Sequence, residues 1–365
     1  MKTKVFAIVA IVEGLIGLGC EGNNEPQNHQ LTNQLNTQLA ALSAPLSEQS
    51  ALLMDAPALE TASAIRAAFQ RGTQKDISFA VYDLADVPRG GAGTVAARAA
   101  ALGLAGAEDP GIDNNRLGFT SGTRRLTRNQ HSGAEFFADT ARFHRGAGVA
   151  RERLFADGDY INAARGYVNR SFGAEAAQAA LFPYKVRKYL NASAAAGGSP
   201  QGETVYQIAV AFNSTVDGIP VIGPGSKVVV HMTPDGEVVG HEASLRAIKG
   251  RRATVAGSDL VAPDEAKAVV EARMKSRGID LRNYNLTREE FGYLRRGRNS
   301  VQRVLVPHYA YIYEPASKDV MGKKVVELVP AVRDRALLVA VHADEAAEHS
   351  RKAEAMRGVG APNVK

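Results

Sequence analysis

The 365-residue sequence contains a single cysteine, Cys20, and no tryptophan. One cysteine excludes a disulfide framework within the chain and a metal site built on several thiolates. Aromatic residues make up only 6% of the chain, whereas glycine and alanine are abundant. We therefore expect cores built from Val, Ile, Leu and Ala. A chain of this length buries enough surface for one or two domains without covalent cross-links.

The sequence also lacks a strong charge of either sign. Its formal net charge is +6, which is mild for this length. Such a charge permits contact with anionic surfaces but does not indicate nucleic-acid binding, because a nucleic-acid-binding face needs concentrated basic charge. We expect no nucleic-acid partner.

The chain has no apolar run long enough to cross a bilayer near its start. Lys2 and Lys4 provide a positive region, and residues 5–12 form a short apolar segment that Glu13 interrupts. A transmembrane helix needs about 20 apolar residues. This layout is therefore typical of an export signal that is cleaved, not of a permanent membrane anchor.

Residues 15–20, Leu-Ile-Gly-Leu-Gly-Cys, resemble the lipobox of bacterial lipoproteins. The resemblance implies that the thiol of Cys20 receives a diacylglycerol and that the mature chain begins at this residue. Glu21 after the cysteine then implies an outer-membrane location, facing the periplasm or the cell surface. Gly17 departs from the usual leucine of the motif, and an ordinary secretory signal with an incidental cysteine is the alternative.

The first third of the chain after the signal shows little regular pattern. Residues 21–50 are rich in Asn, Gln, Ser and Thr, which is typical of a flexible tether. Leucines at helical spacing over residues 31–42 favour a surface helix as the alternative. We expect residues 51–150 to be an irregular region, with a short helix at 59–70 and long loops over 85–133 that contain short pieces of helix or strand.

A first α+β unit is expected over residues 151–250. Asp157 or Asp159 begins a helix with one apolar stripe, and Gly173 ends it. Strands follow at 182–190 and 205–216, and the turn at 234–237 joins a hairpin of 227–232 with 238–241. Period two in the second strand predicts a core face of Tyr206, Ile208, Val210 and Phe212, and an opposite face of Val205, Gln207, Ala209 and Ala211.

A second α+β unit is expected over residues 251–345. Pro263 suits the first turn of a helix, which Gly278 ends. Its buried stripe is predicted to comprise Ala266, Val269, Val270 and Met274. Strands are predicted at 302–314, 323–331 and 335–343, followed by a polar tail over 346–365. The fold class is therefore α+β, in which a helix packs on an antiparallel β-meander in each of two tandem units.

The run from Val216 to Leu245 resembles the propeptide modules of thermolysin-type metallopeptidases, the PepSY and FTP modules. The shared features are the turn and strand at 217–221, the strand and hairpin around Asp235-Gly236, and the helix that opens at 262–266. An unrelated cystatin-like α+β domain is the alternative. The resemblance covers residues 155–345 and implies a chaperone or inhibitor of a secreted metallopeptidase. No HExxH motif follows, so we expect the module without its catalytic domain.

The usual sequence motifs of catalytic sites are absent or incomplete in this chain. His241-Glu242 begins like a zinc-peptidase motif, but Leu245 stands where the second histidine is needed, and the segment leaves a strand. No GxSxG elbow or Walker lysine is present. His231, His308 and His342 fall in expected strands, where we interpret them as half-exposed strand residues. We assign no catalytic residue, metal or cofactor, and expect a protein that is not an enzyme.

Two basic clusters remain as candidate contacts for an acidic partner. The first comprises Lys249, Arg251 and Arg252, and the second comprises Arg295, Arg296, Arg298 and Arg303. Clustered arginines suit carboxylate or phosphate groups. Solvated loops in a basic protein are the alternative interpretation.

The leading hypothesis is a lipid-anchored envelope protein that binds or restrains another protein, such as a secreted peptidase. We expect the contact at an edge strand of the 205–240 meander, because unpaired backbone groups accept a partner's strand. The alternatives are an envelope hydrolase with a site in residues 60–150, and a binding module for an anionic envelope polymer.

Overall fold

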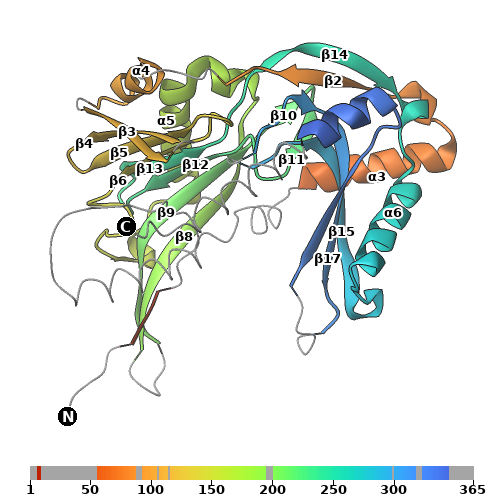
Figure 1. The fold of residues 1–365 in the computed structure, drawn as a ribbon. Coiled ribbons are helices and arrows are strands. Elements are labelled where there is room, and N and C mark those ends of the chain that lie inside the picture. The colour runs from red at the N-terminus through yellow and green to blue at the C-terminus, as the bar shows by residue number, and fades with distance from the viewer. Residues whose placement is uncertain are drawn as a thin grey trace, which may run out of the picture. The chain divides into compact units, whose positions relative to one another are not determined.

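The computed structural model describes residues 6–9, 56–87, 93–104, 107–113, 116–194, 200–297, 300–317 and 323–344. The chain divides into two compact units (Figure 1). Unit 1 contains Met1–Leu46, Pro88–Asn213 and Lys227–Leu245, and unit 2 contains Ser47–Val87, Ser214–Ser226 and Arg246–Lys365. Both are α+β with mostly antiparallel strands, so the expected fold class is confirmed at that level. The expected division at 150/151 and 250/251 does not match the units, because each unit combines segments that are distant in sequence.

Unit 1 is built on one large antiparallel sheet. Its strand order is β1-β8-β9-β12-β13-β6-β5-β4-β3, and β7 pairs with β9 beyond the end of β12. The strands are β1 (Phe6–Val9), β3 (Ala107–Asp113), β4 (Arg116–Ser121), β5 (Arg124–Asn129), β6 (Glu135–Asp139), β7 (Val149–Ala150), β8 (Phe182–Ala194), β9 (Pro200–Asn213), β12 (Val228–Met232) and β13 (Val238–Ala243).

Helix α5 (Asp157–Gln178) packs on one face of this sheet. Its acidic first turn suits the positive end of the helix dipole. Its apolar stripe, at i, i+4, i+8 and i+12, meets the side chains of β9 and β12; the stripe consists of Tyr160, Ala164, Val168 and Phe172. The regular helix ends at Gly173, as expected, because this residue takes a non-helical φ of 41°. A short second helical segment follows the kink and runs to Gln178.

The predicted alternation of β9 holds for only part of the strand. Ile208, Val210 and Phe212 lie in the core under α5, as expected. Tyr206 instead packs with Ala209 on the opposite face, and Val205 joins the α5 core. The register against β8 shifts at this point, because Tyr189 faces Gln207 whereas Leu190 faces Val205. A single extra residue in a strand exchanges the faces of everything beyond it.

The region 85–133 contains the expected short pieces of helix and strand, but they replace the long loops that its glycines and aspartates suggest. It forms α4 (Gly93–Ala101) and strands β3, β4 and β5, which continue the sheet from β6. The apolar residues of this layer form a separate small core of Val95, Ala99, Leu104, Phe119, Leu126 and Phe137. The strands are short and contain Gly, Pro, Asp or several Arg residues, so propensity alone does not reveal them.

Unit 2 contains two sheets. The larger has the order β10-β11-β15-β17-β18, and the smaller has the order β14-β2-β16. The strands are β2 (Ser78–Leu84), β10 (Thr215–Val216), β11 (Ile219–Ile222), β14 (Ile248–Ala256), β15 (Tyr284–Leu294), β16 (Val304–Leu305), β17 (Pro307–Pro315) and β18 (Val325–Pro330). Strand β11 runs parallel to β15, whereas the other pairs are antiparallel.

Helices α3 (Ala56–Arg71) and α6 (Pro263–Ser276) contribute to the core of unit 2. The start of α6 at Pro263 and its end before Gly278 are confirmed, and this glycine takes a φ of 75°. Ala266, Val270 and Met274 are buried as predicted, but Val269 is 38% exposed. The helix at 59–70 is likewise confirmed within α3.

The strand predicted at 335–343 is wrong, because residues 335–344 are helical. The carboxylate of Asp334 accepts hydrogen bonds from the backbone nitrogens of Ala336 and Leu337 at 2.7 and 3.0 Å, which caps the helix. Leu337 and Val341, four residues apart, enter the core of unit 2. Valine-rich composition suggested a strand, whereas the spacing of the buried pair is helical.

The long strands of the 205–240 meander are not sheet edges, because β9, β12 and β13 each have a neighbour on both sides. The two-residue strand β10 of the same region does lie at the end of the larger sheet of unit 2, so the predicted edge contact fails on the long strands and remains a prediction only at β10. Among the described strands, the sheet of unit 1 ends with β3 on one side and with β8, extended by β1, on the other. Cys20, the tether at 21–50 and the tail at 346–365 lie outside the described residues. Within the described residues, no helix has the length and apolar character needed to cross a membrane.

Candidate functional site

The arginines expected to contact an acidic partner lie in unit 2, but they do not form one patch. Arg251 and Arg252 are exposed on β14. Arg252 donates to the carboxylate of Asp83 at 3.1 Å, and Arg251 lies beside the phenol of Tyr82. Arg298 lies outside the described residues. The exposed pair on β14 therefore already contacts polar side chains of β2.

Arg295 is the exception among these arginines, because its side chain is buried. It follows the end of β15, and the residue is 5% exposed. Its Nη2 donates to the carbonyl oxygen of Arg246 at 3.1 Å. Its Nε and Nη1 atoms are buried without a hydrogen-bond partner among the described residues. Burial, together with the charge of Arg246, lowers the pKa of Arg295 to about 9.

Arg246, which no sequence pattern singled out, is the charged neighbour of Arg295. Its guanidinium donates to the backbone oxygens of Ala85, at 2.9 Å, and Gln302. Burial lowers the pKa of Arg246, and the nearby carboxylates of Asp344 and Asp86 oppose this. Arg246 therefore has acidic groups near it. Among the described residues, no carboxylate offsets the effect of burial on the pKa of Arg295. The charged group that acts on it is a second arginine, Arg246, which lowers this pKa further.

The backbone at Arg295 is held from two sides. Its N–H donates to the oxygen of Ile222 at 2.9 Å, and its oxygen accepts from the N–H of Gly225 at 3.1 Å. A Cβ on Gly225 would lie 2.3 Å from the oxygen of Arg296, so only glycine allows this approach. On the other side, the amide of Gln302 donates to the oxygen of Leu294 at 2.8 Å. The backbone that carries the buried guanidinium is therefore fixed by hydrogen bonds on both sides.

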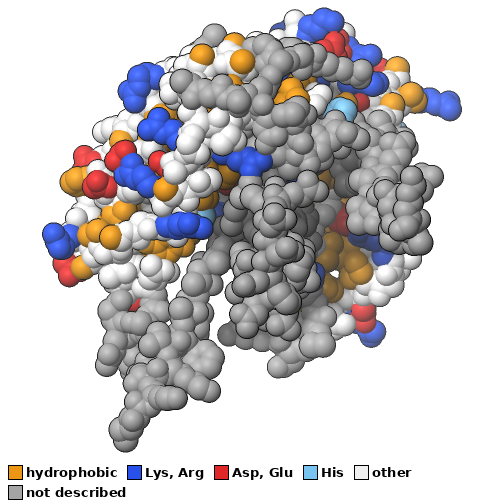
Figure 2. Space-filling view, turned by 60° about the vertical axis from the view of Figure 1, so that its left-hand side comes forward, with side chains coloured by type: hydrophobic (Ala, Val, Ile, Leu, Met, Phe, Trp, Pro, Cys, Tyr) orange, Lys and Arg blue, Asp and Glu red, His pale blue; other side chains and the backbone are white. Residues whose placement is uncertain are grey.

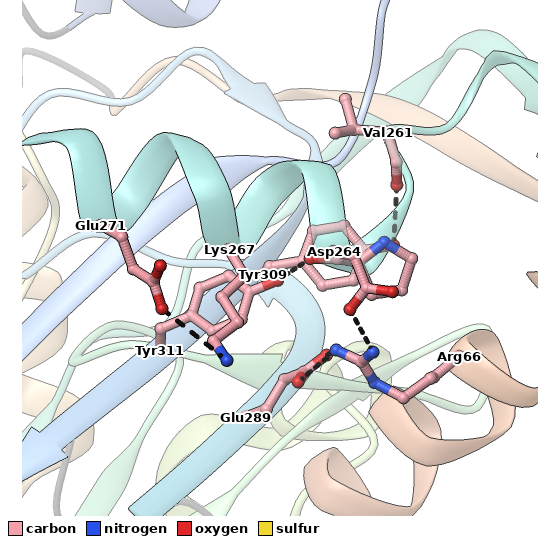
Figure 3. A network of polar contacts seen from close by, with 9 residues as sticks. Arg66, Val261, Asp264, Lys267, Glu271, Glu289, Tyr309 and Tyr311 are labelled. Atoms are coloured by element: carbon pink, nitrogen blue, oxygen red, sulfur yellow. Dashed lines mark hydrogen bonds and ion pairs between the residues drawn. The ribbon is translucent and has the colours of Figure 1, made fainter. Parts of the chain in front are cut away.

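Another arginine of unit 2 shows how this fold normally compensates such a charge. Arg66 of α3 lies between the carboxylates of Asp264 on α6 and Glu289 on β15 (Figure 3). Its Nη2 lies 2.7 Å from Oε2 of Glu289. Burial opposes the charged form, but both carboxylates raise the pKa of Arg66. Beside it, the phenols of Tyr309 and Tyr311 donate to backbone oxygens at the start of α6.

Unit 1 contains a buried polar network centred on Glu135. Arg98 of α4 donates to its carboxylate from Nε and Nη2, at 3.0 and 2.7 Å. Nε2 of His241 lies 2.8 Å from the same carboxylate, and Nδ1 of His241 lies 2.6 Å from the hydroxyl of Tyr167. The guanidinium of Arg98 also lies over the ring of Phe172, 4.4 Å from its centroid. The network joins α4, β6, β13 and α5.

The charges in this network follow from its hydrogen bonds. Burial raises the pKa of Glu135, but His241 and Arg98 outweigh this effect and bring the pKa to about 2. Burial lowers the pKa of His241, so the imidazole is neutral. Because an ionised carboxylate only accepts, Nε2 of His241 donates to Glu135 and Nδ1 accepts from Tyr167. Burial raises the pKa of Tyr167 to about 12, so the phenol keeps its proton.

A second polar cluster lies on the other face of the same sheet. Nδ1 of His231 is 2.9 Å from Nε2 of Gln207, and the N–H of His144 donates to Oε1 of Gln207 at 2.8 Å. The ring centroids of His144 and His231 are 6.3 Å apart, and the ring of Phe143 contacts both, at 4.3 and 4.9 Å. Burial, together with the charge of His231, lowers the pKa of His144 to about 4.

The histidines considered in the sequence have different surroundings from those expected. His231 and His308 are strand residues but are buried, each 3% exposed, so the expectation of half-exposed positions is wrong. His342 lies in the helix at 335–344 and not in a strand. His241 uses both ring nitrogens within the Glu135 network. Among the described residues, no group of three His, Cys, Asp or Glu side chains could hold a metal ion.

Comparison with known proteins adds a weak likeness in fold. No protein-family model and no curated protein matches the sequence. A solved structure of an uncharacterized protein from Eubacterium rectale aligns with 70% of this chain and 84% of its own, at 9% sequence identity and a TM-score of 0.38. At this level the likeness carries no inference about function.

Glu135→Ala should destabilise unit 1 by about 3 to 5 kcal/mol, because it leaves the charge of Arg98 buried and uncompensated. The measurement is chemical denaturation at pH 7. Glu237→Ala is the matched control, since it removes the carboxylate of the exposed Arg142–Glu237 pair and should cost less than about 1 kcal/mol. Equal costs for the two variants would show that the buried network does not contribute as described.

Unit 1 should lose stability as the pH falls from 7 to 5. The folded-state pKa values of His144 and His241 lie below the ordinary value, so the unfolded chain binds more protons below about pH 6.5. The stability contributed by the neutral histidines is thus complete above that pH and declines below it. His144 has a φ of 57°, which asparagine tolerates, so His144→Asn removes the titration without new strain.

We expect the loss between pH 7 and pH 5 to be smaller in His144→Asn than in the wild type by about 1 to 2 kcal/mol. Hydrogen exchange of the β12 amides at both pH values measures this difference. The same pH dependence in both proteins would contradict the assignment of His144.

Proposed function

We propose that this chain is a lipid-anchored protein of the bacterial cell envelope that binds another protein and is not an enzyme. The observation that carries the binding role is the open edge of β8. Residues 182–190 pair with β9 on one side and have no strand on the other among the described residues. An antiparallel edge of this length presents a row of backbone donors and acceptors that a partner's extended segment can complete.

The edge already accepts one extended segment where β8 continues. Residues 191–194 pair antiparallel with β1, in which Phe6 faces Ala194 and Val9 faces Asn191. Strand β1 belongs to the expected export signal. Cleavage before Cys20 would therefore remove it and extend the open edge of β8 over its whole length.

The charge of β8 favours an acidic partner segment. The strand carries Lys185, Arg187 and Lys188 and contains no Asp or Glu. Burial, together with the charge of Arg187, lowers the pKa of Lys185. Lys188 lies 2.8 Å from Asp157 of the same unit, whereas no ion pair holds Lys185 among the described residues. An acidic segment beside β8 would supply the missing counter-charge.

The resemblance to propeptide modules supports a secreted metallopeptidase as the class of partner. Such a module acts by packing against its peptidase, and an exposed sheet edge suits that role. An anionic polymer is a less suitable partner, because it needs a continuous basic surface. On the face that Figure 2 shows, described Lys and Arg side chains lie among acidic, apolar and other side chains.

Cys20→Ala should abolish the lipid attachment and release the exported protein from the membrane fraction. The thioether to the lipid forms only at this thiol, and the chain contains no other cysteine. Incorporation of labelled palmitate into the expressed protein measures the modification. Incorporation that persists in Cys20→Ala would exclude the lipoprotein assignment, whereas an unlabelled but cleaved wild type would indicate an ordinary secretory signal.

Strand addition is tested with two labelled eight-residue peptides, one alternating Val with Glu and the other alternating Val with Lys. We expect the full-length protein to bind the acidic peptide, and the double variant Lys185→Glu, Arg187→Glu to bind it about tenfold more weakly, because two favourable charge pairs are lost. Fluorescence anisotropy measures both affinities. The control is Arg124→Glu on β5, a strand paired on both sides. Equal weakening in both variants, or a preference for the basic peptide, would contradict the proposal.

A further inference from the structure

Arg66, Arg246 and Arg295 are three of the arginines of unit 2 that are buried or half-buried, and their surroundings differ in one respect. Arg66 contacts two carboxylates. Arg246 donates to two backbone oxygens and lies near Asp344 and Asp86. Arg295 is as deeply placed as any of them, yet its guanidinium makes a single hydrogen bond among the described residues, to the oxygen of Arg246. Of these three arginines, Arg295 is therefore the one that lacks a nearby carboxylate among the described residues.

An uncompensated buried guanidinium is costly. Removing an ion from water costs several kcal/mol unless a partner charge and hydrogen bonds repay it. Three of the five N–H donors of Arg295, one on Nε and two on Nη1, have no acceptor among the described residues. The nearby charge of Arg246 increases the cost, because the two cations repel each other. A negatively charged ligand would remove each of these penalties at once.

The surroundings of Arg295 are also suited to holding a ligand. Its backbone is fixed by Ile222 and Gly225 on one side and by the Gln302 amide on the other. A guanidinium whose backbone is fixed in advance loses little conformational freedom when it binds. Its planar fork matches the oxygens of a carboxylate or phosphate, and Arg246 adds a second positive charge.

We propose that Arg295, supported by Arg246, is the binding site in unit 2 for one compact oxyanion, a carboxylate or phosphate group. The burial of Arg295 excludes the exposed, extended contact that a polyanion makes, so the ligand presents a single small anionic group. This site is separate from the β8 edge of unit 1, and neither proposal depends on the other.

The proposal is tested on the full-length protein with sodium phosphate and sodium acetate as probes, at constant ionic strength set with chloride. We expect a saturable rise in thermal stability with at least one of them, because a ligand that binds the folded state stabilises it in proportion to RT ln(1 + [L]/Kd). Circular dichroism follows unfolding. Phosphate and acetate distinguish a phosphate from a carboxylate ligand. No saturable effect with either probe would overturn the proposal.

The decisive variant is Arg295→Gln, which removes the charge and retains an amide. We expect it to weaken binding of the effective probe about 10- to 100-fold, the loss expected for hydrogen bonds to a charged group. Without the probe, the variant should unfold at the same temperature as the wild type or higher, since an uncompensated charge is gone. The control is Arg252→Gln, which removes an exposed arginine of the same unit and should bind like the wild type. Equal binding by all three proteins would overturn the proposal.

If Arg295→Gln does not fold, two further measurements decide. Arg295→Lys keeps the charge but loses the planar fork, and it should bind the probe more weakly than the wild type. In the wild type, hydrogen exchange should slow at residues 222–225 and 295–297 when the probe is added, because these segments hold Arg295. Exchange unchanged there while the protein is stabilised would place the anion elsewhere and overturn the assignment.

Discussion

The cost of burying a charge is the constraint that organises both units. In unit 1, Glu135 lies within the sheet, where the strand β6 backbone alone could not satisfy its carboxylate. Arg98 supplies the positive charge, and both Arg98 and His241 donate hydrogen bonds to this carboxylate. The hydroxyl of Tyr167 forms a hydrogen bond with the second ring nitrogen of His241. These four side chains come from two helices and two strands. The positions of α4 and α5 on the sheet therefore depend on a polar interaction as well as on apolar packing.

Unit 2 meets the same constraint with different elements. Arg66 of α3 is fixed by carboxylates from α6 and β15, and the tyrosines of β17 donate to the backbone at the start of α6. These contacts set the helices on the sheet, above a core of aliphatic and aromatic side chains. Arg295 differs because its buried guanidinium has neither a carboxylate nor a full set of hydrogen-bond acceptors among the described residues. The contrast between Arg66 and Arg295, within one unit, is the observation on which the proposed oxyanion site rests.

Local sequence signals predicted several elements correctly. Helix α6 begins at Pro263 with an acidic first turn and ends at Gly278, and the hairpin of β12 and β13 turns at Asp235-Gly236. Each of these rests on a residue whose backbone preference operates over a few positions. The predictions failed where the outcome depended on distant partners. Residues 335–344 are helical because Asp334 caps them and Leu337 and Val341 meet the core, although their composition favours a strand.

The candidate sites divide in the same way. The clustering of arginines in the sequence indicated anion recognition, and Arg295 was among them. No pattern could show that Arg295 is buried while Arg252 is exposed, or that Arg246 lies next to it, because burial and proximity arise only when β15 and the chain around Arg246 come together. Similarly, Glu135 and His241 are 106 residues apart, and their contact has no sequence signature.

By itself, the sequence determined the α+β class, the ends of α6, the apolar stripe of α5 and the hairpin of β12 and β13. Only the tertiary structure decided the order of the strands, which leaves β8 open on one side and gives β9, β12 and β13 a neighbour on both sides, and the pairing of buried charges. The physical reason is the range of the interactions. Turns, caps and periodicity act within a few residues, whereas strand order and charge compensation depend on which distant segments exclude water from one another.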